Sequence, residues 1–293
     1  KMKFSLIWEA ANASSPASME AWKTYYVPYF IENYFKDARY MTIDNRPVLA
    51  VFGVDDVCKR LALGESGVKE AFDYLENEVK KLGFDGMLYL ACGGHSGNLA
   101  AMGYDGWYPY SWGTEGYSLD VNITSMKNSV LNESVYAVPT VSVGFNSIPW
   151  HGIRYPLMSV TDYKAAHSWV KSTYLPTYAK EKWQNNFVML STWNEYGEGT
   201  YIMPSGLNGF GYLDVLREAY TDETADEKLN AVPNSVQRER INHLYPQYRR
   251  LLRKQGAYTP DIRLDKLDKV YTVDYSKLSP ETPGITNVSR SPA

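Results

Sequence analysis

Two glutamates three residues apart, Glu195 and Glu198, are the residues of this chain whose type and spacing could best do chemistry. They follow an apolar, strand-like run at residues 187–190. Two carboxyl groups facing one cavity can cleave a glycosidic bond, because one protonates the leaving oxygen while the other acts as base or nucleophile. Gly197 and Gly199 would let the backbone bend so that both acids face that cavity. The same spacing is also common on solvated helix faces.

The neighbours of the two acids favour the catalytic interpretation. Trp193, Tyr196 and Tyr201 offer flat apolar surfaces for sugar rings, and Asn194 adds a polar contact. Residues 184–216 contain no lysine or arginine, so the acids lack a local cationic partner. The segment therefore predicts a sugar-binding site with two functional carboxyl groups.

Composition limits the class of protein. The chain has 293 residues, of which 44% are hydrophobic and 22% charged, which is typical of one large globular α/β domain or two smaller ones. The 25 tyrosines and 8 tryptophans fit a cleft lined by aromatic rings, although a tyrosine-rich core would also account for them. A net charge of −3 without a basic stripe argues against nucleic acid as a partner.

Neither a metal nor another cofactor is expected. Cys58 and Cys92 have no metal or redox spacing, and we expect both to be unpaired. No pair of histidines has a ligand spacing, and the glycine-rich segment 93–97 lacks the spacing of a phosphate-binding loop. No apolar run is long enough to predict a membrane span.

The acids must be positioned by alternating strands and helices. Continuous apolar runs predict six buried strands, at residues 3–9, 47–54, 86–92, 107–112, 137–144 and 187–193. Amphipathic patterns predict helices at residues 19–34, 66–82, 121–131, 161–182 and 236–254, the second beginning with a serine cap and the fourth with Thr161-Asp162. This alternation indicates an α/β fold built from β/α units with right-handed crossovers.

Polar and aromatic residues recur where the predicted strands end. A (β/α)8 barrel collects its active site at the carboxyl ends of its strands, whereas a doubly wound sheet concentrates it at one switch point. The recurrence favours the barrel, with the doubly wound sheet as the alternative. The candidate substrate-binding residues at these ends are Trp8, Glu9, Asn12, Tyr110, Trp112, Asn146, Trp150 and His151. Core packing is the alternative role for Trp8, and turn packing is the alternative for the loop residues 146–151.

Only six β/α units can be counted in this sequence, whereas a complete barrel has eight. Six strands alone would leave two apolar strand edges exposed. We therefore expect a barrel whose first two units are absent from this sequence. Residues 1–256 are expected to form the barrel. Residues 257–293, rich in charge, proline, serine and threonine, are expected to be a linker or the start of an appended module.

The segment WNEYGEGT at residues 193–200 resembles the W-N-E-x-x-E-G-T motif of glycoside hydrolase family 99-like proteins, also called WbsX-type proteins. Residues 3–8, 40–48 and 138–150 are similar to further stretches of that family in the same order, so the resemblance spans residues 1 to about 220. Family members carry additional sequence before the first of these stretches, in agreement with two absent units. The motif is also similar to W-N-D-Y-G-E of family 71 α-1,3-glucanases.

The resemblance implies a retaining, endo-acting glycosidase for an α-linked polysaccharide such as α-mannan. It implies that Glu195 deprotonates the sugar's own 2-hydroxyl and that Glu198 is the general acid and then the base. Between the two acids the family usually has an aromatic residue followed by histidine or alanine, whereas this chain has Tyr196-Gly197. The difference affects how the two acids are positioned and which substrate is bound. There are two alternatives. One is a WbsX-type glycosyltransferase of surface-polysaccharide synthesis, and the other is a non-catalytic carbohydrate-binding barrel. A polysaccharide hydrolase is expected to be secreted, periplasmic or at the cell surface, and a transferase to be cytoplasmic.

Overall fold

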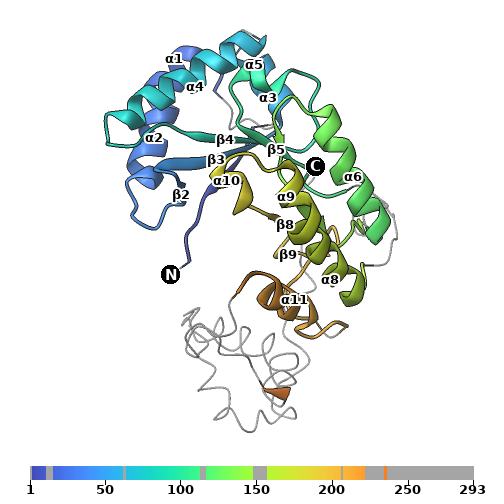
Figure 1. The fold of residues 1–293 in the computed structure, drawn as a ribbon. Helices are drawn as coiled ribbons and strands as arrows, with labels where there is room; N and C mark the ends of the chain where they lie inside the picture. The colour runs from blue at the N-terminus through green and yellow to red at the C-terminus, as the bar shows by residue number, and fades with distance from the viewer. Residues whose placement is uncertain are drawn as a thin grey trace, which may run out of the picture. The chain divides into compact units, whose positions relative to one another are not determined.

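The computed structural model describes residues 2–10, 16–61, 64–112, 117–147, 157–205, 207–221, 234 and 235 (Figure 1). The chain divides into two compact units. The first comprises Lys1–Met203 with Tyr212–Tyr220, and the second comprises Pro204–Gly211 with Thr221–Ala293. Within the described part of the second unit, Ser205 and Gly209 form an antiparallel bridge. The predicted helix at 236–254 and the predicted linker at 257–293 lie outside the described residues.

The strands of the first unit confirm the predicted α/β class. Two sheets hold the parallel strands, and an additional strand β2 (Thr42–Ile43) pairs antiparallel with β3. The parallel strands are β1 (Leu6–Glu9), β3 (Arg46–Phe52), β4 (Leu88–Cys92), β5 (Gly106–Tyr108), β6 (Tyr136–Ala137), β7 (Thr140–Ser142) and β8 (Met189–Ser191). Each predicted strand has its counterpart, and the single run predicted at 137–144 corresponds to β6 and β7 together.

β6 and β7 are one extended segment that changes partner. Before Pro139, the Val138 N–H donates to the Trp107 oxygen at 2.8 Å, which continues the pairing with β5. At Pro139, the Met189 N–H donates to the proline oxygen at 2.9 Å, which begins the pairing with β8. Each of the six parallel segments therefore lies beside the next one in the sequence.

This order of the strands distinguishes between the two predicted architectures, the barrel and the doubly wound sheet. A doubly wound sheet reverses its strand order at the switch point, whereas a (β/α)8 barrel adds each strand beside its predecessor. The order β1-β3-β4-β5-β6, continued by β7-β8, follows the barrel pattern. No described strand pairs with the outer edge of β1 or of β8, where Ile7 is 56% exposed and Leu190 is also exposed. The two upstream units thus stay a prediction.

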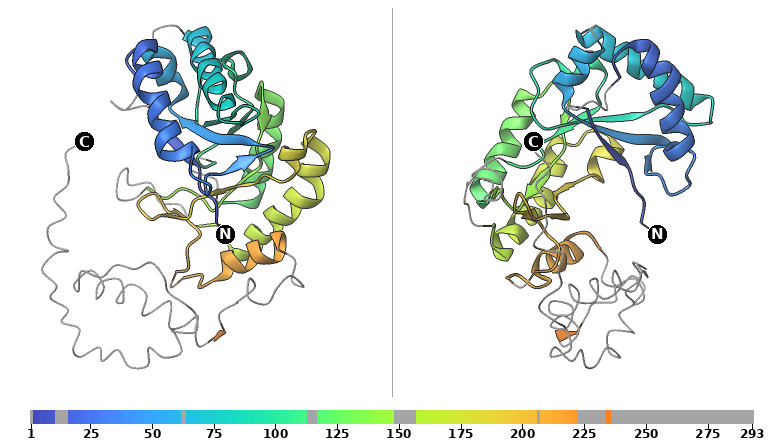
Figure 2. Two further views of the ribbon diagram at one scale, coloured as in Figure 1. Left: turned by 90° about the vertical axis from the view of Figure 1, so that its left-hand side faces the viewer. Right: turned by 180° about the vertical axis from the view of Figure 1, so that it is seen from behind.

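The helices cover the outer side of the curved sheet (Figure 2). Four segments, α1 (Met19–Ala21), η1 (Trp22–Tyr26), α2 (Val27–Phe30) and η2 (Ile31–Phe35), form one continuous helix capped by Ser18. The others that were predicted are α4 (Gly64–Lys80), α6 (Leu119–Asn132) and the continuous run α8 (Val160–Trp169), η4 (Val170–Tyr174) and α9 (Leu175–Tyr178). Four further helices were not predicted: α3 (Val54–Arg60), α5 (Leu99–Met102), α10 (Lys182–Asn185) and the amphipathic α11 (Gly211–Tyr220).

Two of the predicted helices have different boundaries in the structure. Helix α4 already includes Gly64, so Ser66 lies in its first turn and is not its cap. The helix predicted at 161–182 is capped by Ser159, whose Oγ accepts from the Asp162 N–H, and it ends at Tyr178 because Ala179 adopts an extended backbone. Among the described residues, no helix combines the length and apolar character needed to cross a bilayer.

Tyrosines contribute strongly to the core. The core packs the helices against the outer sheet face and also fills the inner face of the strands. Its buried tyrosines are Tyr40, Tyr89, Tyr104, Tyr108, Tyr163, Tyr174 and Tyr212. Core packing therefore accounts for a substantial share of the tyrosine content, which the sequence had also allowed to be cleft lining. Cys58 and Cys92 are both free, as predicted.

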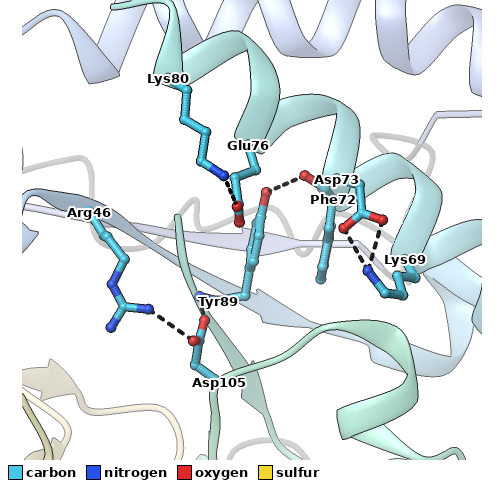
Figure 3. Close-up of polar contacts among 8 residues, drawn as sticks. All are labelled: Arg46, Lys69, Phe72, Asp73, Glu76, Lys80, Tyr89 and Asp105. Atoms are coloured by element: carbon cyan, nitrogen blue, oxygen red, sulfur yellow. Dashed lines mark hydrogen bonds and ion pairs between the residues drawn. The ribbon is translucent and has the colours of Figure 1, made fainter. Parts of the chain in front are cut away.

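An ion pair ties three strands together at their amino-terminal ends (Figure 3). Asp105 accepts from Arg46 Nη1 at 3.1 Å and from the Tyr89 N–H at 2.8 Å. The Tyr89 hydroxyl donates to the Phe72 oxygen at 3.0 Å, and the two rings stack 4.0 Å apart. Burial raises the pKa of Asp105, against the opposing influence of the Tyr89 N–H and of Arg46. This end of a parallel α/β fold serves stability.

Candidate active site

The two candidate acids lie on a β-hairpin that directly follows β8. Its strands are β9 (Asn194–Glu195) and β10 (Thr200–Tyr201), in the register Glu195 with Thr200 and Asn194 with Tyr201. Residues 196–199 form the turn. The alternative interpretation of the pair as one face of a solvated helix is therefore wrong, and the acids stand at the carboxyl end of a parallel strand.

Glu195 is half-buried and is held by its own turn. Its Oε1 accepts from the Gly197 N–H at 3.1 Å, and its backbone N–H donates to Thr192 Oγ1 at 3.3 Å. The glycine after Tyr196 thus supplies a backbone donor to the carboxylate. These contacts fix the direction in which Glu195 leaves the hairpin.

Glu198 is half-buried and is tied to the loop that follows β7. The Asn146 N–H donates to the Glu198 carbonyl oxygen at 2.6 Å. The next residue, Gly199, has φ +65°, and a Cβ added to it would lie 2.7 Å from the Asn146 Cβ. Only glycine allows both this backbone conformation and this approach. The predicted binding residue Asn146 is therefore brought beside the candidate acid.

Tyr110, just beyond β5, completes this cluster. Its phenol lies close enough to Thr200 and Glu198 for both to influence its pKa. Burial raises its pKa to about 12, and the neighbouring Glu198 and Glu195 act in the same direction, so the phenol is neutral across the physiological range. Tyr110 also packs edge-on against Phe52, whose ring centroid lies 6.2 Å away at the end of β3. Residues from the ends of several strands therefore meet around the hairpin.

Aromatic rings surround the acids on the hairpin itself. Trp193 and Tyr196 are 51% and 52% exposed, which is unusual for side chains of this size. The rings of Tyr196 and Tyr201 lie 4.7 Å apart at 45°. Asn194 is exposed beside them. These are the surfaces that a sugar ring can stack on and bond to.

The remaining predicted residues have different surroundings. Trp8 is only 8% exposed and stacks on Trp22 at 5.5 Å within the helix-facing core, so it packs the fold as the alternative interpretation allowed. Trp112 is half-buried, and its indole N–H donates to the Thr140 oxygen at 2.8 Å, which ties the end of β5 to β7. Glu9 is half-buried and lies beside Phe52 in the register of β1 and β3. Asn12, Trp150 and His151 lie outside the described residues.

Sequence reasoning missed the hydroxyl pair Thr192 and Thr200. The two Oγ1 atoms lie 3.1 Å apart at the base of the hairpin. The signal was available in their placement on either side of the acidic motif, one residue before Trp193 and one after Gly199. Phe52 was missed because an apolar residue at a strand end carries no sign of a site.

Comparison with known proteins gives one family match. Residues 117–216, which include the whole hairpin, match the family model described as "Glycosyltransferase WbsX". This match confirms the resemblance to WbsX-type proteins that the motif indicated. No curated protein matches the chain.

Several solved structures are similar at low identity. One is the GH99 endo-alpha-mannosidase from Bacteroides thetaiotaomicron, at 18% identity and a TM-score of 0.46, with 69% of this chain and 56% of that chain covered. The GH99 endo-alpha-mannosidase in complex with BIS-TRIS-propane gives 14% identity and a TM-score of 0.45, with coverages of 69% and 59%. The matched region thus spans little more than half of those chains.

Proposed function

We propose that this protein is a retaining, endo-acting glycoside hydrolase for an α-linked polysaccharide such as α-mannan. The observation that carries the proposal is the hairpin after β8, which holds Glu195 and Glu198 three residues apart, with Tyr110 beside Glu198. Two acids at the carboxyl end of a parallel strand, flanked by exposed aromatic rings, are the arrangement that glycoside cleavage requires.

The proposed reaction has two steps and uses only carboxyl groups. Glu195 takes the proton from the sugar's 2-hydroxyl, and the oxygen attacks C1 to form a 1,2-anhydro sugar, while Glu198 protonates the departing glycosidic oxygen. Water then attacks C1 with Glu198 as its base, and the 2-oxygen regains its proton from Glu195. Two inversions at C1 give retention. The Gly197 N–H orients Glu195, and the neighbouring Tyr110 phenol would orient Glu198.

The surroundings of the acids support a neutral glycan as the substrate. Trp193, Tyr196 and Tyr201 would stack on sugar rings, while Glu9, Asn146 and Asn194 would bond to hydroxyl groups. The described side chains that meet at the hairpin contribute carboxylates, hydroxyls, amides and rings, and none of these described side chains is a cation that could pair with a phosphate. Such a substrate lies outside the cytoplasm, so we infer a secreted, periplasmic or cell-surface protein.

The family match supports a second candidate function. A WbsX-type glycosyltransferase would act on a nucleotide-sugar or lipid-linked donor, and its activity would be cytoplasmic. Among the residues that the structure describes, the side chains known to lie near Tyr110 (Phe52, Thr200, Glu195 and Glu198) include no cation for a diphosphate. Saturable binding of a nucleotide-sugar in calorimetry would favour this function over hydrolysis.

The test is hydrolysis of a panel of α-mannans and α-glucans by the protein and by Glu195→Gln and Glu198→Gln. We expect oligosaccharides from the parent, none from either variant, and thermal melts that agree closely. Glu20→Gln, which changes an exposed acid on the helix at 19–35, is the matched control and should retain full activity. Activity in both glutamine variants would refute the mechanism, and unchanged glycan binding by inactive parent and variants would indicate a non-catalytic binding protein.

A further inference from the structure

Thr192 occupies the junction between β8 and the hairpin. Its backbone N–H donates to the Thr200 oxygen at 2.8 Å, and its own oxygen accepts from the Ile202 N–H at 3.0 Å. These two bonds set the hairpin on the end of β8. The side chain is half-buried and is not part of a core cluster.

The Thr192 hydroxyl makes additional hydrogen bonds, one as a donor and one as an acceptor. Its Oγ1 donates to the Thr200 oxygen and accepts from the Glu195 N–H at 3.3 Å. A hydroxyl can donate and accept at the same atom, which no aliphatic side chain of the same shape can do. The group therefore joins the backbone of Glu195 to that of Thr200, two residues after Glu198.

The other acid lies on the same hairpin. The Thr192 and Thr200 hydroxyl oxygens lie 3.1 Å apart, and Thr200 stands two residues after Glu198. Tyr110 lies near Thr200 and Glu198. The bonds of Thr192 thus tie the backbone of Glu195 to the strand that follows Glu198.

We propose that Thr192 is a positioning residue whose hydroxyl fixes Glu195 relative to Glu198. This inference rests on the proposed glycosidase function of the site. In the proposed reaction the two acids must act on neighbouring atoms of one sugar, so their separation matters. A displacement of about 1 Å at a reacting group can cost roughly 100-fold in rate.

Two substitutions separate the hydroxyl from the rest of the side chain. Thr192→Val keeps the shape and removes both bonds, whereas Thr192→Ser keeps the hydroxyl and removes a methyl group. We expect kcat to fall roughly 10- to 100-fold in Thr192→Val with KM within about twofold of the parent, and Thr192→Ser to restore most of the rate. Thr140→Val is the matched control, because it removes a hydroxyl that bonds only locally, to the Val138 oxygen two residues earlier in the same segment.

A second measurement does not depend on activity. The Glu195 amide should exchange its hydrogen at least about tenfold faster in Thr192→Val than in the parent or in Thr192→Ser, while amides of the core strand β4 keep their rates. If the parent hydrolyses no glycan, the proposed function fails while this exchange result still tests the role of Thr192.

Three outcomes would overturn the inference. One is a normal kcat and a normal Glu195 exchange rate in Thr192→Val. Another is an equal loss in the valine and serine variants, which would assign the effect to the methyl group. The third is failure of both Thr192→Val and Thr192→Ala to fold, which would make Thr192 a structural residue.

Discussion

The Asn146 N–H donates to the Glu198 carbonyl oxygen across 2.6 Å, and this bond fastens the loop after β7 to the turn that bears the candidate acid. The contact is possible because Gly199 follows Glu198. At φ +65° and without a Cβ, Gly199 lets the two backbones touch. Segments that are distant in the sequence are thereby held at one place, and the geometry of the acid depends on both.

Gly199→Ala should therefore damage stability and activity together. The new Cβ would stand 2.7 Å from the Asn146 Cβ in a backbone conformation that alanine disfavours. We expect a loss of about 1–3 kcal/mol in the free energy of unfolding, measured by denaturant titration, and loss of hydrolysis. Gly94→Ala, whose Cβ would meet nothing within 4 Å, should change neither quantity. A stable, active Gly199→Ala protein would contradict this contact.

Tyr110→Phe should lower the rate more than the stability. The variant removes the hydroxyl beside Glu198, and a hydrogen bond from it to a charged group would contribute about 1.5–3 kcal/mol. If that bond persists in the transition state, kcat/KM should fall roughly 10- to 100-fold. Because the pKa of Tyr110 is about 12, the pH–rate profile should gain or lose no step below pH 10. Tyr25→Phe, at an exposed site, is the control, and an equal loss there would argue against a specific role.

His167 should make the fold sensitive to acid. The ring is buried, its Nδ1 lies 2.8 Å from the Tyr220 hydroxyl, and burial lowers its pKa from 6.5 to about 3. Below pH 6.5 the unfolded state takes up a proton that the folded state does not, so stability is lost as the pH falls toward 3. The loss from this group amounts to roughly 4–5 kcal/mol.

Urea unfolding of the parent and of His167→Gln between pH 7 and pH 4 would measure this effect. The variant removes the titrating group, so its stability should fall less steeply with acid even if it is lower at pH 7. Parallel slopes in the two proteins would show that His167 titrates normally.

Asp105 should lower the stability of the fold as the pH rises, which is opposite to the effect of His167. Burial raises its pKa in the folded state, so the folded protein holds this proton more tightly than the unfolded chain does. Its contribution to stability is greatest below the unfolded pKa and is lost as the pH rises through the folded pKa. In Asp105→Asn this decline between acid and neutral pH should disappear, although the ion pair with Arg46 is lost as well. Asp85→Asn, which changes an exposed acid outside the ion pair with Arg46, is the matched control.

Much of the fold could be predicted from the sequence because its signals are local. Apolar runs located all six parallel segments, since strands buried on both faces must be apolar along their length. Amphipathic spacing found the long helices, while four-residue helices such as α5 and α10 carry too few residues for a period. The motif at 193–200 identified the pair of candidate acids and the family resemblance.

Only the tertiary structure decided what surrounds those acids. The hairpin places Glu195 opposite Thr200, the loop after β7 brings Asn146 to Glu198, and the end of β5 brings Tyr110 to the same carboxylate. From the sequence, Trp8 could line a cleft or pack in the core, and its stacking on Trp22 shows that it packs in the core. The physical reason is that apolar periodicity depends on neighbours along the chain, whereas hydrogen bonds and close backbone contacts between distant segments depend on how the strands are ordered in space.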